Sequence, residues 1–362
     1  MGKINAFFSG KVLAVYIKTE KEELLASYEE RLSAINGEIA EKEKLASDVE
    51  LQVENRITDA KLNAAKFIAD LAFIPSNYVI TNQQESKSNT VNYYCEGVSL
   101  DPDSIEEFKN WKETIEGIEI ELREAGVNEQ LSYGLAKFLY SAYCMNQPVL
   151  LAGPNGGDIA DALSAAMYGR LAGRFICMGE FNLDGIDCIR DSNDPIVVIE
   201  NLFRKDWVDY IDRITGIKGK YIIITSPFAD DLIIEPKGIY NYVLPLITDV
   251  FVNDTANRDF LGGIGVQNKL DVNKKASKGK YENLLMKAGA SARYRSVVNK
   301  VMLIMKSIQN EMTTDEDYMY VIYPFMFATS NSLILEEYIK SDQHISKDFR
   351  KTLLMKLGES DE

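Results

Sequence analysis

The chain has 362 residues, of which 46% are hydrophobic and 26% charged, as in ordinary globular proteins that contain more than one compact unit. Its 55 acidic residues outnumber its 40 lysines and arginines, which argues against a protein that coats nucleic acid with its whole surface. The single histidine, His344, excludes histidine-based zinc sites and any histidine-dependent triad with an early nucleophile, and we expect no metal.

Nothing in the sequence favours secretion or a membrane. The first residues lack an apolar core of signal-peptide length, and the four cysteines contain no C-x-x-C pair, which is typical of buried thiols in a reducing compartment. The longest charge-free stretch, 318–335, contains Pro324 and several polar residues, so we expect a buried core segment there. These features predict a cytoplasmic protein without membrane contact.

Residues 1–75 are expected to form a helical or coiled-coil region. From Thr19 to about Leu71 the chain has no proline and is dense in Glu, Lys, Ala and Leu, and Pro75 ends the segment. Apolar residues repeat every seventh position in two series, of which the second loses its apolar character after Val49. Pairing between chains and packing within one chain therefore both stay open. The seam residues are Leu25, Tyr28, Leu32, Ile35 and Ile39.

Residues 76–104 are polar and turn-rich, which predicts a linker or an exposed hairpin at a domain boundary. Ser104 and Glu107 then have capping-box spacing, and we expect a helix to begin there. Apolar spacing predicts a second helix over about 128–145.

The pattern then changes to short apolar runs bounded by turn residues. The runs are 148–152, 175–178, 196–200, 221–225 and 249–252, and helix-length segments separate the first four. Such alternation predicts a parallel sheet with helices on both faces. The pattern becomes helical again from about residue 280. We therefore predict an α/β core over 105–262, and a basic loop with a helical lid over 263–362.

The first predicted strand runs into a glycine-rich turn and then a helix, the arrangement in which phosphate-binding loops occur. Here the chain resembles a P-loop ATPase, and more narrowly the MoxR/McrB-type branch of the AAA+ superfamily, over about 105–357. The positions that correspond to the loop are Gly153, Pro154, Asn155, Gly156, Gly157, Asp158, Ile159 and Ala160.

Other landmarks of that family follow in the same order. The resemblance implies that the run 196–204 contains the Walker B strand and the residues that follow it. Glu200 would stand in for the magnesium-associated aspartate and Asn201 for the water-activating glutamate, and Arg204 would correspond to the trailing arginine. The resemblance also implies a sensor-1 position at Ser226 or Pro227 and a sensor-2 position at Arg293. The segment 240–252 contains no arginine that could act in a neighbouring subunit.

The departures from the loop pattern predict weak nucleotide binding. Asp158, Ile159 and Ala160 stand where the family has glycine, lysine and a hydroxyl. Loss of the lysine costs about 1.5–3 kcal/mol, and a carboxylate beside a phosphate costs about 3 kcal/mol. A sum of about 5 kcal/mol would move a micromolar site to about 10 mM. The simplest alternative is that the turn is retained only for packing.

We therefore expect a pseudo-ATPase, with no catalytic residue and no cofactor, that acts as an assembly or scaffold subunit. Its partners would be further copies of itself, an effector or an active ATPase, by analogy with McrB-like proteins in a prokaryotic antiviral defence complex. One alternative is an active NTP-hydrolysing switch with an unconventional pocket, which would need ATP and magnesium. Another is a nucleic-acid-binding module that uses a basic patch within 268–295, although a solvated loop also explains that patch. The patch residues are Lys269, Lys274, Lys275, Lys278 and Lys280.

Overall fold

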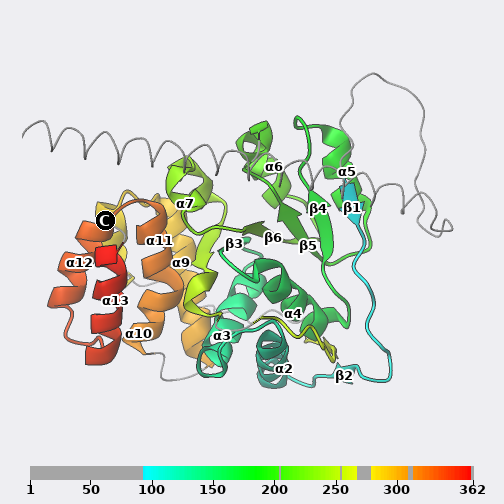
Figure 1. Ribbon diagram of the computed structural model, residues 1–362, viewed down its shortest axis with the longest axis horizontal. Helices are drawn as coiled ribbons and strands as arrows, with labels where there is room; N and C mark the ends of the chain where they lie inside the picture. The colour runs from blue at the N-terminus through cyan, green and yellow to red at the C-terminus, as the bar shows by residue number, and fades with distance from the viewer. Residues whose placement is uncertain (1–92, 204, 253–254, 267–278, 309–312, 360–362) are drawn as a thin grey trace, which may run out of the picture. The chain divides into compact units, whose positions relative to one another are not determined.

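The computed structural model describes residues 93–203, 205–252, 255–266, 279–308 and 313–359 (Figure 1), all within the unit Lys87–Glu362. Several predictions concern residues outside these ranges. They are the helical region 1–75 with its seam Leu25, Tyr28, Leu32, Ile35 and Ile39, the Walker B residue Arg204, and the patch residues Lys269, Lys274, Lys275 and Lys278.

The described residues form strands and helices in alternation, followed by helices alone. The strands are β1 (Tyr93–Cys95), β2 (Glu106–Glu107), β3 (Val149–Ala152), β4 (Gly173–Ile176), β5 (Ile196–Glu200), β6 (Tyr221–Ser226), β7 (Leu244–Ile247) and β8 (Gly263–Ile264). The helices are α2 (Trp111–Glu124), α3 (Glu129–Cys144), α4 (Gly156–Tyr168), α5 (Leu183–Asp191), α6 (Ile211–Thr215), α7 (Asp231–Ile234), α8 (Glu282–Lys287), α9 (Ala292–Ile308), α10 (Thr314–Asp317), α11 (Tyr323–Ala328), α12 (Ser332–Ser341) and α13 (Lys347–Glu359).

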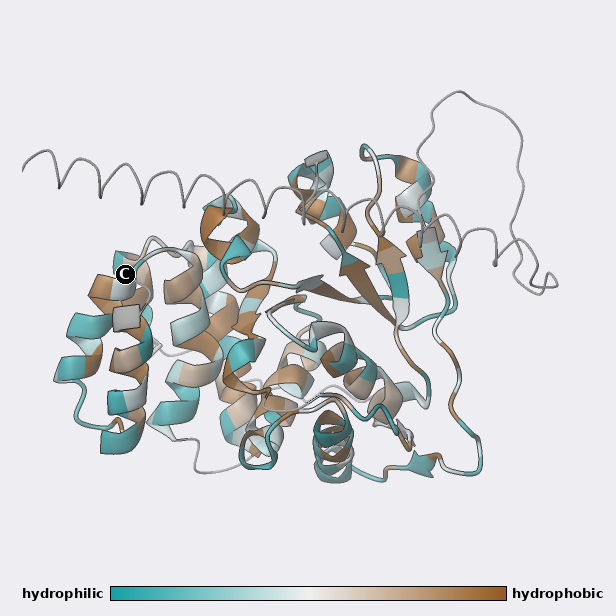
Figure 2. Ribbon diagram, in the orientation of Figure 1, coloured by the Kyte–Doolittle hydropathy of each residue, from teal (hydrophilic) through white to brown (hydrophobic). Residues whose placement is uncertain are grey.

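The main sheet has six strands in the order β1-β4-β5-β6-β3-β7. Strands β3 to β7 are all parallel, and β1 adds an antiparallel edge to β4. The first four residues of β5 are buried apolar side chains, as a strand covered on both faces requires. Helices α2 to α4 lie on one side of the sheet and α5 to α7 on the other (Figure 1), and the central strands are mostly hydrophobic (Figure 2). The predicted α/β class with a mostly parallel sheet is confirmed.

The last predicted strand, 249–252, is wrong. The strand is β7, and the chain then turns through a short 3₁₀ helix at Thr248–Val250. Strand β7 contains Pro245, which has no backbone N–H to donate. Because β7 pairs only with β3 and forms the sheet edge, the proline is tolerated there.

The predicted start of the first long helix is also wrong. Ser104 caps no helix; its hydroxyl donates to the carbonyl oxygen of Leu261, at 2.7 Å. Helix α2 begins six residues later with Asn110 as its N-cap, whose side-chain oxygen accepts from the backbone N–H of Glu113. The Glu113 carboxylate in turn accepts from the backbone N–H of Lys109, at 2.7 Å, one residue before the cap, so the helix end is closed by a variant of the capping box.

Two strands lie close to the predicted domain boundaries. Strand β1 falls inside 76–104, so this part of the segment is an edge strand of the sheet. The hydroxyl of Tyr94 donates to the buried carboxylate of Asp194, at 2.6 Å, which anchors that edge. Strand β8 falls just after residue 262 and pairs in parallel with β2. The core therefore extends beyond both ends of 105–262.

Helices follow from residue 282 to 359, as the apolar spacing predicts. The segment expected to be buried contains a π-helical turn, Tyr318–Ile322, and then α11, and the side chains of 320–328 are buried. Within the described part of the chain, no helix is long and apolar enough to cross a membrane.

The cysteines are only partly as predicted. Cys144 and Cys177 are buried thiols and Cys95 is half-buried, but Cys188 on α5 is exposed. The prediction that all of them are buried is therefore wrong at Cys188, which lies on the solvent side of a short amphipathic helix.

Candidate functional site

The candidate site lies at the point where the order of the strands in the sheet reverses. The chain leaves β3 for β4 along one face of the sheet, through α4, and it leaves β6 for β7 along the other face, through α7 (Figure 1). In open parallel sheets such a switch point leaves a crevice at the carboxyl ends of the two adjacent strands, and ligands bind there. A pocket of about 410 Å³ occupies this place. It is lined by Gly153, Pro154, Asn155, Gly156, Gly157, Asp158, Arg174, Glu200, Asn201, Thr225, Ser226, Pro227 and Arg258.

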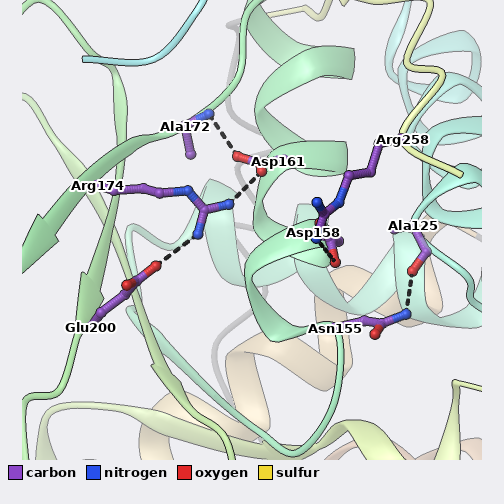
Figure 3. Close-up of polar contacts among 8 residues, drawn as sticks. All are labelled: Ala125, Asn155, Asp158, Asp161, Ala172, Arg174, Glu200 and Arg258. Carbon is purple, nitrogen blue, oxygen red and sulfur yellow. Dashed lines mark hydrogen bonds and ion pairs between the residues drawn. The ribbon is translucent and has the colours of Figure 1, made fainter. Parts of the chain in front are cut away.

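The turn after β3 is short and tightly packed. Gly153 has φ +118°, and a Cβ there would lie 2.6 Å from the Thr248 hydroxyl oxygen, so only glycine fits. Asn155 follows in the left-handed region with φ +55°, and its side-chain amide donates to the carbonyl oxygen of Ala125, at 2.9 Å (Figure 3). Helix α4 begins at the next residue. The turn therefore consists of residues 153–155 alone.

Because α4 already begins at Gly156, the positions 158–160 are helical, and the helix sets the direction of their side chains. Asp158 lines the pocket from the first turn of α4. Ile159 and Ala160, which stand where a P-loop has lysine and a hydroxyl, are fully buried in the core and do not line the pocket. The side chains at both positions face the core.

Arg174 of β4 connects two carboxylates that come from α4 and β5 (Figure 3). Its guanidinium Nη2 lies 2.5 Å from Asp161 Oδ2 on α4, and Nη1 lies 2.7 Å from Glu200 Oε1 at the end of β5. Burial raises the pKa of Asp161, and Arg174 partly offsets that effect. A Cβ on Gly157 would lie 2.8 Å from Nη1, so this glycine makes room for the arginine.

Arg258 forms a second ion pair at the mouth of the pocket. Its Nε lies 2.7 Å from Asp158 Oδ1, and its Nη2 donates to Oδ2 at 3.3 Å (Figure 3). The Asp158 side chain is 11% exposed and that of Arg258 is 69% exposed. The hydrogen bond to Asp158 raises the pKa of Arg258. The carboxylate expected to repel phosphates is thus already compensated by an arginine of the same chain.

Of the remaining predicted site residues, Asn201 and Ser226 line the pocket and Arg293 does not. Asn201 lines the pocket with φ +60°, and the buried Ser226 donates from its hydroxyl to Asp231 Oδ2 at 2.7 Å. The guanidinium carbon of Arg293 lies 5.1 Å from the ring centre of Tyr242, and its sensor-2 role stays a prediction.

Sequence reasoning missed the two arginines of the pocket. A signal was present for Arg174, because a charged residue in the half-buried strand β4 needs a charged or polar partner. None was present for Arg258, which lies 100 residues from Asp158 in an irregular segment. The pocket is thus lined by two carboxylates, Asp158 and Glu200, and by two guanidinium groups that bind them, and Arg174 also binds Asp161 outside the lining. The described residues contain no cluster of His, Cys, Asp and Glu that could hold a metal.

Of the predicted basic patch, the structure describes only Lys280. Its ammonium group donates to the hydroxyl of Thr314 at 3.1 Å, lies 3.8 Å from Asp317, and sits over the ring of Tyr281. This lysine is therefore engaged with its own chain.

Comparisons with protein-family models, curated proteins and solved structures gave no match. Any functional assignment therefore depends on the fold and on the geometry of the site.

Proposed function

We propose that residues 105–357 form a catalytically degenerate P-loop module of the AAA+ type, and that the protein serves as an assembly or scaffold subunit without hydrolysing ATP. One observation carries the proposal: the pocket at the switch point has the position and the strand–turn–helix order of a nucleotide site, but its charged side chains are already paired with one another.

The position of the pocket supports a nucleotide-binding ancestry. The turn Gly153–Asn155 joins β3 directly to α4, and Glu200 and Ser226 end the neighbouring strands β5 and β6. These elements converge at the carboxyl edge of the sheet, where parallel α/β folds bind ligands.

The chemistry of the pocket supports the loss of catalysis. An intact P-loop contributes a lysine to the phosphates and a hydroxyl to magnesium, but here both positions lie in the core as Ile159 and Ala160. Glu200 holds Arg174, and Asn201 has an amide that cannot take a proton from water. The glycines at 153 and 157 are explained by internal packing alone.

The proposed assembly role depends on the heptad pattern that includes Leu32 and Ile39. Its partners would be copies of this chain, an effector or an active ATPase. By analogy with McrB-like proteins, the assembly would be cytoplasmic and would act in antiviral defence.

The first experiment is calorimetric titration of ATP with magnesium into the full chain. We expect no saturable micromolar binding, because the lysine contact to the phosphates, worth about 1.5–3 kcal/mol, is missing and the charged side chains of the pocket are already paired. Saturable micromolar binding that Glu200→Gln abolishes would instead support an NTP-binding switch.

A second variant tests the geometry directly. Restoring the lysine with Ile159→Lys should create no ATP site and should lower the free energy of unfolding by about 3 kcal/mol or more, because the ammonium group enters the core. The matched control is Ile120→Lys on α2, where the side chain is 49% exposed and little change is expected. A stable Ile159→Lys variant that binds ATP would contradict the proposal.

The assembly role has its own test. We expect light scattering to show the full chain as an oligomer, and we expect Leu32→Asp in the seam to dissociate it. The adjacent change Ser33→Asp, outside the seam, should leave the oligomer intact. A strictly monomeric protein that copurifies with no partner would contradict the assembly role and leave the ATP result unaffected.

A further inference from the structure

A second pocket, of about 390 Å³, lies at the start of α9. We call it the α9 pocket. Its walls come from the 3₁₀ segment Lys237–Asn241, from the connection between α8 and α9, and from α11. It shares no residue with the Gly153 pocket, and its volume is in the range of small-molecule sites.

The α9 pocket is basic in an acidic protein. Its lining includes two lysines, Lys237 and Lys287, and no aspartate or glutamate. The Lys237 ammonium donates to the Thr329 carbonyl oxygen at 2.6 Å, which leaves two further N–H donors. Lys287 is exposed and forms no ion pair with any described residue. The lining therefore favours an anion.

The backbone adds donors beside the pocket, at the two residues that follow the lining residue Ser291. Helix α9 is 17 residues long, and the N–H groups of its first residues, Ala292 and Arg293, have no hydrogen-bond partner among the described residues. The dipole of a helix of this length favours negative charge at this end. Gly289, with φ +81°, has no atom within 4 Å of a Cβ position, so the approach to the helix start is open.

Tyr294 supplies an independent sign of a ligand. Its side chain lines the pocket and is only 3% exposed, yet its hydroxyl has no hydrogen-bond partner among the described residues. The ring is held by stacking on Phe325, with centroids 4.3 Å apart. Burial raises the pKa of Tyr294 well above its usual value, so the hydroxyl remains a donor at neutral pH. The hydroxyl is therefore available to a ligand in the pocket.

We propose that the α9 pocket binds a small phosphate-bearing ligand. The phosphate would accept hydrogen bonds from the α9 N-terminus, the Tyr294 hydroxyl and the two lysines. A phosphate monoester would place its remaining atoms against the rings of Tyr240 and Phe325, which also line the pocket. This site is separate from the Gly153 pocket and does not depend on the function proposed for it.

The test is calorimetric titration of the full chain with inorganic phosphate and with adenosine monophosphate, in a low-salt chloride buffer. We expect saturable binding, which Lys287→Glu weakens at least about tenfold and Tyr294→Phe about fivefold, as loss of a charge-assisted and of a neutral hydrogen bond implies. The matched control is Lys300→Glu, an exposed lysine of α9 outside the pocket, and it should leave the affinity unchanged.

The two probes distinguish the source of the phosphate. Tighter binding of adenosine monophosphate supports a monoester, and binding of inorganic phosphate alone supports the free ion. The absence of saturable binding for both probes up to about 10 mM would overturn the proposal. A second result would also overturn it: binding that is unchanged in folded Lys287→Glu and Tyr294→Phe variants but is lost in Arg258→Gln. The ligand would then occupy the Gly153 pocket, which Arg258 lines.

Discussion

The ion pairs of Arg174 offer the sharpest test of how the Gly153 pocket is held together. The substitution Arg174→Met keeps most of the side chain's length and removes its charge. It leaves Asp161, whose side chain is 8% exposed, without its guanidinium, and Glu200, whose side chain is 30% exposed, without its partner. Asp161 then retains the backbone N–H of Ala172, at 3.1 Å.

The expected cost follows from burial. A unit charge pair about 4 Å apart interacts by about 4 kcal/mol at an effective dielectric constant of 20, and the desolvation of Arg174 offsets part of this. Removing one partner of a buried pair typically costs about 3–5 kcal/mol, because the other charge stays buried. Since Arg174 is 32% exposed, we expect a loss near the lower limit, about 3 kcal/mol.

The assay is urea unfolding at pH 7, followed by the fluorescence of the buried Trp207. The double variant with Asp161→Asn should recover at least half of the loss, because no buried charge remains. Arg190→Met is the matched surface control: its pair with Asp187 is more than half exposed on both sides and should contribute less than about 0.5 kcal/mol.

The pH dependence has a definite sign. Burial already raises the folded-state pKa of Asp161, and removal of Arg174 raises it further. The folded variant then holds a proton that the unfolded chain releases, so its stability falls as the pH rises from the usual carboxyl range through the folded pKa. The deficit of Arg174→Met should be full at pH 7 and shrink as the pH is lowered. A loss below about 1 kcal/mol at pH 7, or a deficit independent of pH, would refute the reasoning.

Three further outcomes follow from single contacts. Gly153→Ala should lower the free energy of unfolding by about 2 kcal/mol, because φ is +118° and a Cβ would meet an oxygen at 2.6 Å; an unchanged urea midpoint would contradict this. Tyr94→Phe should cost about 1–2 kcal/mol and speed hydrogen exchange in β1, because the buried carboxylate of Asp194 loses a donor; unaltered exchange would show that the contact does not hold the edge. Iodoacetamide at pH 8 should alkylate Cys188 well before the buried Cys177, as mass spectrometry can establish; the reverse order would place α5 wrongly. Partial burial and, after it, nearby aspartates raise the pKa of Cys188, so added salt, which screens the aspartates, should speed its reaction.

Local patterns were enough to predict the central strands. Residues 196–200 are a continuous apolar run that ends in Glu200, and the structure places β5 over the same residues. Strand β7 was missed because Pro245 argues against a strand unless the strand lies at an edge, and edge position is a property of the whole sheet. The helix expected at Ser104 failed for a similar reason, because its hydroxyl bonds to Leu261, 157 residues away.

The sequence by itself determined the α/β class, the glycine turn after β3, and the absence of lysine and hydroxyl at Ile159 and Ala160, because these depend on residue types over a few neighbouring positions. Only the tertiary structure decided that these two side chains face the core and that Arg174 and Arg258 neutralise the pocket. The physical reason is that each charge pair joins residues between 13 and 100 positions apart, which no local pattern connects.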